Sequence, residues 1–292
     1  MYVKWIVTDM DGTLLNSRDQ ISEKTRAALL ACQEKGIRLI LASGRSYIRQ
    51  MPYAEQLRLA EFGGAMIEVN GLALNRLQNG GREVFERLSR EDKELLFSEL
   101  QRFEVEIHGY QDEALYYWIP DWQRPFKEQE RKEKGYPPEH PLVAGPWSWV
   151  TSNVHSYPVM KEIFSGKEMP DELNKMGCSD RPERIPEVYE YLKEHFEKRY
   201  EIARTDSRSI EISRKGISKG NALKRLMEEE GVRPEEVLAF GDGENDISLF
   251  RAVSHSIAMG NAEDYVKEHA TDVTGTNNED GIVMALEKYG VL

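Results

Sequence analysis

A short apolar run that ends in two aspartates constrains the fold of this 292-residue chain more than any other stretch. Residues 3–7 are almost entirely apolar, as expected of a short strand that is buried on both faces. Asp9 and Asp11 follow, one residue apart, and lead into Gly12 and Thr13. Open α/β sheets bind their ligands at the carboxyl ends of such strands. Two carboxylates this close repel each other, so a cation between them is the simplest way for both to stay ionised, and the stretch predicts a metal site.

The chain continues to residue 71 as alternating strands and helices. The expected elements are a helix at 22–35 capped by Ser22, a strand at 37–42, a helix at about 47–59 and a strand at 65–69 that ends at Asn70 and Gly71. The strand at 37–42 also ends in polar residues, namely Ser43, Gly44 and Arg45. Because strands joined by a helix run parallel, this unit is expected to present Asp9, Asp11 and Ser43 at one edge of the sheet.

The pattern changes at residue 72 and changes back near residue 206. Apolar and polar residues alternate over 72–88 around Asn79, Gly80 and Gly81, which is a strong hairpin-turn pattern. The elements expected next are helices at 89–103 and 187–198 and strands at 105–107, 114–119, 158–164, 200–205 and 209–212. Those expected after Ser218 are helices at 218–230, 246–252, 262–269 and 280–289 and strands at 237–240, 255–259 and 272–273. The chain therefore predicts an α/β fold, with a Rossmann-like parallel-sheet core from residues 1–81 and 206–292 and an inserted α+β domain at 82–205.

Four polar motifs occur in a fixed order along the predicted core. The stretch Asp9–Leu15 resembles the first motif of the haloacid dehalogenase-like hydrolases. The other three motifs of that family are matched by Ser43 within Leu41–Arg45, by Lys219 within Gly216–Gly220 and by the acidic run Gly241–Asp246. Ser43 stands where many relatives have Thr, which keeps the hydroxyl. The insertion, the run 217–222 and the tail 276–281 are similar to the Cof-type branch with a C2B cap.

The resemblance implies a Mg²⁺-dependent phosphatase that works through an aspartyl-phosphate. It makes Asp9 the nucleophile and Asp11 the general acid and base, while Lys219 adds positive charge. The Mg²⁺ ligands it implies are the Asp9 carboxylate, the Asp11 backbone carbonyl and Asp242. Asp246 is expected to support Asp242, Lys219 or the metal without touching the ion, or else to be a direct metal ligand.

The same resemblance implies a binding site for the phosphoryl group. The Ser43 hydroxyl, the Gly44 backbone N–H and the Asn245 side chain are expected to hold phosphate oxygens, and Asn245 lies at the start of a helix, where anions are favoured. These groups contact only the phosphoryl group, so they do not identify the substrate. A sugar phosphate, FMN or another flavin-pathway phosphate, and pyridoxal phosphate all remain open.

Other interpretations of the same residues stay open. Arg45 either contacts substrate or pairs with an acidic neighbour. The charged run 127–134 is most simply a solvated helix face. Trp118, Trp122, Trp147 and Trp149 either pack or stack on a flat substrate. Two further functions also fit: a phosphomutase of the same superfamily and a sensor that binds a phosphorylated ligand without turnover.

Composition limits the partners. With 39 basic and 51 acidic residues, the net charge of -12 argues against nucleic acid or an anionic membrane as the main partner. The small phosphorylated metabolite is the partner that the family resemblance implies. Cys32 and Cys178 are isolated and have no metal-binding spacing, which favours a reducing cytoplasm. No apolar run approaches the 18 or more residues of a membrane span. The sequence does not indicate an oligomeric state.

Overall fold

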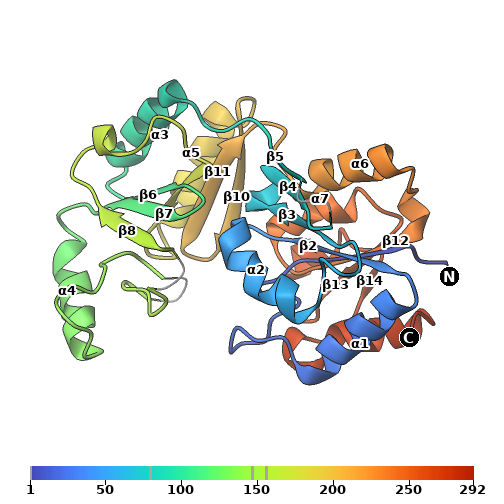
Figure 1. Ribbon diagram of the computed structural model, residues 1–292. Coiled ribbons are helices and arrows are strands. Elements are labelled where there is room, and N and C mark those ends of the chain that lie inside the picture. The colour runs from blue at the N-terminus through green and yellow to red at the C-terminus, as the bar shows by residue number, and fades with distance from the viewer. Residues whose placement is uncertain (1, 79–80, 146–147, 155–156) are drawn as a thin grey trace. The chain divides into compact units, whose positions relative to one another are not determined.

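The computed structural model describes residues 2–78, 81–145, 148–154 and 157–292, and the chain forms two compact units (Figure 1). The first comprises Met1–Phe85 and Ile217–Leu292, and the second comprises Glu86–Gly216. Both boundaries lie further along the chain than the predicted ones at 81/82 and 205/206. The reason is strand pairing: β5 (Gly81–Val84) completes a hairpin with β4 (Ala73–Arg76), whereas β11 (Ser209–Arg214) pairs with strands of the inserted unit. The expected turn residues Asn79 and Gly80 lie outside the described residues.

The first unit is built on an eight-stranded sheet in the order β14-β13-β12-β1-β2-β3-β4-β5. Its remaining strands are β1 (Trp5–Thr8), β2 (Arg38–Ala42), β3 (Ala65–Glu68), β12 (Val237–Gly241), β13 (His255–Ala258) and β14 (Asp272–Val273). The strands from β14 to β3 run parallel, and β4 and β5 are antiparallel additions at one edge. β1 lies between β2 and β12, so the direction in which the chain winds reverses beside β1. Such a switch point is where open α/β sheets place their ligands.

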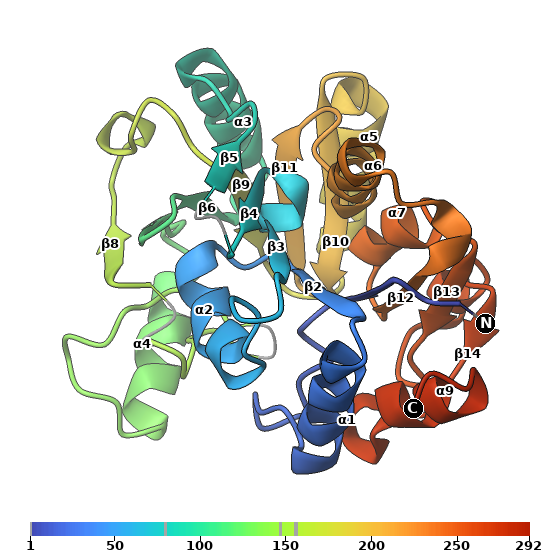
Figure 2. The same cartoon turned by 45° about the vertical axis from the view of Figure 1, so that its right-hand side comes forward.

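Helices cover both faces of this sheet, which confirms the predicted α/β fold. One face packs on α1 (Glu23–Glu34), α2 (Tyr47–Gln56) and α9 (Gly281–Lys288), and the other packs on α6 (Lys219–Glu230) and α7 (Ile247–Phe250). Ile6 of β1 belongs to the first layer and its neighbour Val7 to the second, so the strand is buried on both faces as predicted. Helices α1 and α9, from opposite ends of the chain, lie side by side (Figures 1 and 2). The short helix α8 (Asp264–Lys267) completes the unit.

The inserted unit is a six-stranded sheet in the order β10-β11-β9-β6-β7-β8. Its strands are β6 (Glu106–Tyr110), β7 (Ala114–Trp118), β8 (Val159–Glu162), β9 (Lys175–Ser179), β10 (Tyr200–Asp206) and β11. They pair antiparallel except for β7 with β8. Helices α3 (Arg90–Arg102) and α5 (Ile185–Phe196) supply apolar side chains to the core on one face. A second apolar cluster joins β7 to Leu142, Val143, Val150 and Tyr157, which follow α4 (Arg124–Glu133) in the chain.

Two features of the inserted unit differ from the prediction. Strand β9 was not predicted, because its five residues include only two apolar ones, Met176 and Cys178; it is buried as an inner strand between β6 and β11. The prediction that 127–134 is a solvated helix face was wrong at Lys127. That side chain is fully buried, with Nζ 2.5 Å from Oε2 of Glu106 and 2.6 Å from the Trp149 carbonyl oxygen. The chain that follows α4 folds back and covers this position.

Three tryptophans of the inserted unit contact other aromatic rings, and stacking on a substrate stays a prediction. Trp118 contacts the Phe97 ring at 6.0 Å, and the Trp122 and Trp149 rings meet edge to face at 5.9 Å. Trp147 lies outside the described residues. Cys32 and Cys178 are buried free thiols, as predicted. Within the described ranges, no helix combines the length and the apolar character needed to cross a membrane.

Candidate active site

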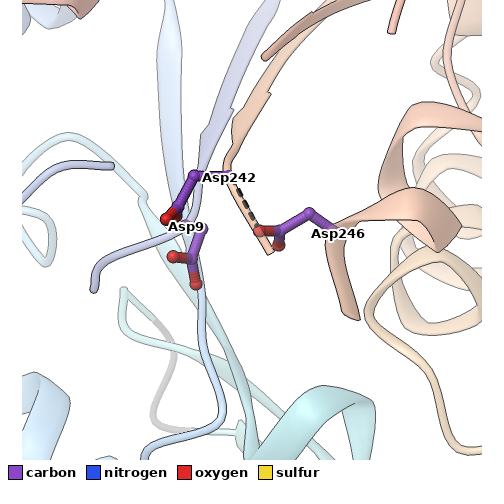
Figure 3. Close-up of side chains that lie close together, drawn as sticks. All are labelled: Asp9, Asp242 and Asp246. Carbon is purple, nitrogen blue, oxygen red and sulfur yellow. Dashed lines mark hydrogen bonds between the residues drawn. The ribbon is translucent and has the colours of Figure 1, made fainter. Parts of the chain in front are cut away.

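Three carboxylates meet at the carboxyl ends of the two central strands. Asp9 directly follows β1, and its backbone N–H donates to the Phe240 carbonyl of β12 at 3.0 Å. Asp242 directly follows β12, and Asp246 closes the turn after it. One oxygen from each carboxylate lies within 4.8 Å of the others, and Figure 3 shows Asp9 and Asp242 facing the same space beside Asp246. The sequence motifs that are farthest apart in the chain therefore converge at the switch point of the sheet.

Lys219 links two of these carboxylates. Its Nζ donates to Oδ1 of Asp9 at 2.6 Å and to Oδ1 of Asp246 at 2.7 Å, and the side chain has no exposed surface. Ser218 caps α6 by accepting from the backbone N–H of Asn221, so the helix begins at Lys219. Gly220 lets this first turn approach helix α7, because a Cβ there would lie 2.0 Å from the Ser248 carbonyl oxygen.

Asp246 holds the acidic turn in shape. Its Oδ2 accepts from the backbone N–H of Asp242 at 3.0 Å (Figure 3). The same oxygen accepts from the Gly243 N–H at 3.0 Å, while Oδ1 accepts from Lys219. Both oxygens therefore already bind donors of this chain. Of the roles expected for Asp246, the contacts that the structure provides are those with Asp242 and Lys219.

Asp242 is positioned by three residues to which the sequence analysis gave no role. The Thr13 hydroxyl donates to Oδ1 at 2.8 Å, and the Asn261 amide donates to Oδ2 at 3.3 Å. Gly12 has φ +77°, and a Cβ there would lie 2.2 Å from Oδ2 of Asp242, so only glycine fits. Gly12 and Thr13 belong to the first motif and could have been noticed on that ground, whereas nothing in the sequence marks Asn261.

The cluster carries more negative than positive charge. Burial, and then repulsion from Asp246, raise the pKa of Asp242 to about 7. Burial also raises the pKa of Asp9 well above its ordinary value, even though Lys219 opposes this. Burial alone would lower the pKa of Lys219, but Asp246 and Asp9 outweigh it and raise that pKa. Three carboxylates and one ammonium leave two negative charges when all are ionised. An all-oxygen set with this deficit fits a hard divalent cation such as Mg²⁺.

The predicted phosphate-binding residues lie around Asn70. The Asn245 amide donates to Oδ1 of Asn70 at 2.9 Å, and the Asn70 N–H donates to the Ser43 carbonyl at 2.9 Å. A Cβ on Gly44 would lie 3.2 Å from Oδ1 of Asn70, so the two residues are close. Val69 and Asn70 both have positive φ, at 48° and 56°, and Val69 is a strained position for a β-branched residue. Asn70 ends a parallel strand as Asp9 and Ser43 do, and that position could have marked it as a site residue.

The Asp11 side chain does not join the carboxylate cluster. It was expected to lie on the same side as Asp9, but it is 60% exposed. Its two oxygens accept from Arg45, one from Nε at 2.8 Å and the other from Nη2. Burial would raise the pKa of Asp11, but the hydrogen bonds and the charge of Arg45 lower it. Of the two interpretations of Arg45, pairing with an acidic neighbour is the one the structure shows.

The chain is similar to proteins of one known family. A family model for haloacid dehalogenase-like hydrolases matches residues 6–286. The phosphatase YwpJ of Bacillus subtilis is 30% identical, over 96% of this chain and 97% of its own. The 5-amino-6-(5-phospho-D-ribitylamino)uracil phosphatase YcsE of the same organism is 28% identical, over 98% and 96%. A crystal structure of a haloacid dehalogenase-like hydrolase from Bacteroides thetaiotaomicron superposes with a TM-score of 0.75 at 28% identity, covering 98% of this chain and 99% of that one.

Proposed function

This chain belongs to the haloacid dehalogenase-like hydrolases and is a phosphatase, and on that premise we propose that it hydrolyses a small phosphate monoester through an aspartyl-phosphate on Asp9. The observation that carries the proposal is the buried Lys219 bridge between Asp9 and Asp246. It fixes the Asp9 carboxylate at a strand end. The positive charge of the same lysine would attract the anionic phosphoryl group toward that carboxylate. An aspartate that only capped a strand would have no need of this partner.

In the first step, an Asp9 oxygen forms a bond to phosphorus while the bond from phosphorus to the leaving oxygen breaks. Asp11 gives its proton to that leaving oxygen, and the alcohol departs. In the second step, water attacks the aspartyl-phosphate and gives its proton to Asp11, which releases phosphate and restores Asp9. Ser43, the Gly44 N–H and Asn245 hold the phosphate oxygens in both steps. Lys219 offsets the charge that builds up between nucleophile and phosphate.

The residues that would hold Mg²⁺ are Asp9, Asp242 and the backbone carbonyl of Asp11. When bound, the ion supplies the positive charge that lets an anionic nucleophile approach an anionic phosphate. Thr13 and Asn261 keep the Asp242 carboxylate oriented, and Asp246 keeps the Asp242 backbone in place whether or not it also becomes a ligand.

We assign the choice of leaving group to the inserted unit, residues 86–216, as a C2B-type cap domain. The candidate substrates are sugar phosphates, FMN or another flavin-pathway phosphate, and pyridoxal phosphate. The relative YcsE, named as a 5-amino-6-(5-phospho-D-ribitylamino)uracil phosphatase, makes the flavin-pathway class the first to test.

The test is phosphate release from a panel of these compounds with Mg²⁺, with EDTA and with the variant Asp9→Asn. We expect metal-dependent turnover that Asp9→Asn abolishes. Asp264→Asn is the matched control, because that carboxylate is 99% exposed on the same unit and should leave the rate unchanged. Turnover that survives in Asp9→Asn would exclude Asp9 as the nucleophile. An intact protein that releases no phosphate but isomerises a sugar phosphate would be a mutase, and one that only binds would be a sensor.

A further inference from the structure

Asn261 joins two loops of the acidic cluster through one side-chain amide. Its Nδ2 donates to the Gly12 carbonyl at 2.9 Å and to Oδ2 of Asp242 at 3.3 Å. Its Oδ1 accepts from the backbone N–H of Asn277 at 3.0 Å. Because Nδ2 faces two acceptors and Oδ1 faces a donor, the amide fits in one orientation. Asn261 therefore ties the loop after β1, which carries Asp9, to the loop after β12, which carries Asp242.

The short 3₁₀ turn η5 (Asn277–Glu279) contacts the same two groups from the other side. The backbone N–H of Asn277 holds the Asn261 amide, and the Asn277 side chain donates through Nδ2 to the Leu15 carbonyl at 2.8 Å. Leu15 is 1% exposed and packs in the apolar layer that α1 and α9 share, so this bond reaches a rigid part of the loop after β1. One turn thus holds both the bridging amide and the loop that it bridges.

The contacts of Asp242 suit a residue that binds a cation. Its donors Thr13 and Asn261 are neutral, so the carboxylate keeps its negative charge. A carboxylate offers about four lone-pair sites, and one donor on each oxygen leaves room for a metal ion. By contrast, both oxygens of Asp11 bind the charged Arg45. Hydrogen bonds that orient a metal ligand typically change the affinity for the metal by about 10–100-fold.

On the basis of the proposed function and its Mg²⁺ site, we propose that Asn261 and Asn277 are positioning residues that set the affinity of the acidic cluster for Mg²⁺. They act through Asp242 and the loop after β1 and are not ligands themselves. Asn261 sets the distance between the two loops that carry the carboxylates, and Asn277 keeps the Asn261 amide and the Leu15 segment in place. Without these amides, Mg²⁺ has to order the two loops when it binds, which costs affinity.

The test is isothermal titration of the metal-free protein with MgCl₂. We expect Asn261→Ala to raise the Kd for Mg²⁺ by about 10–100-fold. Asn277→Ala keeps the backbone N–H but loses the bond to Leu15, and should raise the Kd by about 3–10-fold. The rise in melting temperature at a fixed Mg²⁺ concentration should shrink in the same order, because an ion that binds only the folded state stabilises it less as its Kd rises.

Asn278→Ala is the matched control for Asn277→Ala. The Asn278 Oδ1 accepts from the Ser17 N–H at 3.0 Å, so this variant also removes one hydrogen bond between η5 and the loop after β1. That bond reaches neither Asn261 nor Leu15, and we expect the Kd for Mg²⁺ to stay unchanged. The melting temperature in EDTA reports the stability of each variant separately from its Mg²⁺ affinity. Circular dichroism verifies folding, and Asn277→Ala decides alone if Asn261→Ala does not fold.

An Asn261→Ala or Asn277→Ala variant with the Kd of the intact protein would overturn the proposal, while Mg²⁺-dependent phosphate release would still support the proposed function. An equal rise in Kd for Asn277→Ala and Asn278→Ala would overturn the role of Asn277, because any loosening of the turn would then have the same effect. An intact protein that binds no Mg²⁺ and releases phosphate in EDTA would remove the metal site itself, and this inference with it.

Discussion

Lys219 in the sheet unit and Lys127 in the inserted unit are both fully buried, yet their surroundings differ in charge. Lys219 lies among three carboxylates, and the pKa values of Asp9 and Asp242 are raised there, chiefly by burial. Lys127 pairs with Glu106, which His108 also contacts at 2.9 Å. Burial would raise the pKa of Glu106, but Lys127 and His108 lower it.

The two clusters differ in how the charge of their carboxylates is balanced. Around Lys127, the buried Glu106 carboxylate is matched by the lysine, so its ionisation favours the folded state. Around Lys219, ionisation of the carboxylates costs stability, which proteins tolerate where function requires it. The sign of the carboxylate pKa shift distinguishes the two clusters although both contain a fully buried lysine.

The largest expected difference between the two lysines is the loss of turnover in Lys219→Met. Removal of this charge should lower the rate of phosphate release by about 10²–10³-fold, as the loss of one electrostatic contact in an active site typically does. Lys127→Met removes an equally buried lysine and should cost less than about tenfold. Initial rates on the best substrate of the panel, together with circular dichroism to verify folding, provide the measurement. Similar losses in the two variants would show that the cluster around Lys127 also takes part in the reaction.

Lys127 should also matter for stability. Lys127→Met leaves the Glu106 carboxylate buried without its lysine, which should lower the free energy of unfolding by about 3–5 kcal/mol. Urea unfolding measures this. The double variant Lys127→Met/Glu106→Gln removes the stranded charge and should recover part of the loss. If the single variant were as stable as the intact protein, Glu106 would have to be neutral or solvated, and the contrast between the clusters would fail.

The sequence predicts the sheet unit better than the inserted unit. In the sheet unit, apolar runs end in polar residues, so β1, β2 and β12 and the meeting of Asp9 with Asp242 could all be predicted. Asn70 was missed although it follows the same rule, because only matches to the family motifs were given roles. Asn261 lies in a loop and reaches Asp242 only through the fold, so no local pattern reveals it.

The inserted unit is less predictable because its burial depends on contacts distant in sequence. Strand β9 reads as Lys-Met-Gly-Cys-Ser and has weak strand propensity, yet its neighbours β6 and β11 bury it completely. Lys127 lies in a charged run that would be solvated on an isolated helix. It is buried because Glu106 and the Trp149 carbonyl approach it from other parts of the unit.

A smaller effect on stability should come from Asp92, which completes the capping box with Ser89 at the start of α3 and accepts from the Tyr200 hydroxyl at 2.7 Å. Burial would raise the pKa of Asp92, but hydrogen bonds from Ser89 and Tyr200 lower it to about 2. Its contribution is therefore fully present above about pH 4 and is lost as the pH falls toward 2. Asp92→Asn should lower the free energy of unfolding by about 2 kcal/mol at pH 7. The difference from the intact protein should disappear near pH 2 in acid-unfolding curves, and a constant difference at all pH values would contradict this account.

The smallest expected effect has the opposite sign and concerns Asp242, whose pKa of about 7 exceeds its value in the unfolded chain. Without metal, between about pH 4 and pH 7, Asp242 holds a proton in the folded protein that it has lost in the unfolded chain. The free energy of unfolding therefore falls as the pH rises through that range. Asp242→Asn should therefore raise the free energy of unfolding by about 1–2 kcal/mol at pH 7 in EDTA, and the gain should shrink toward pH 4. Added Mg²⁺ should stabilise the intact protein and not the variant, because binding to the folded state alone adds stability. A variant less stable than the intact protein in EDTA would mean that the ionised Asp242 carboxylate stabilises the fold. Asp242 and Asp92 would then affect stability with the same sign, and this prediction would be wrong.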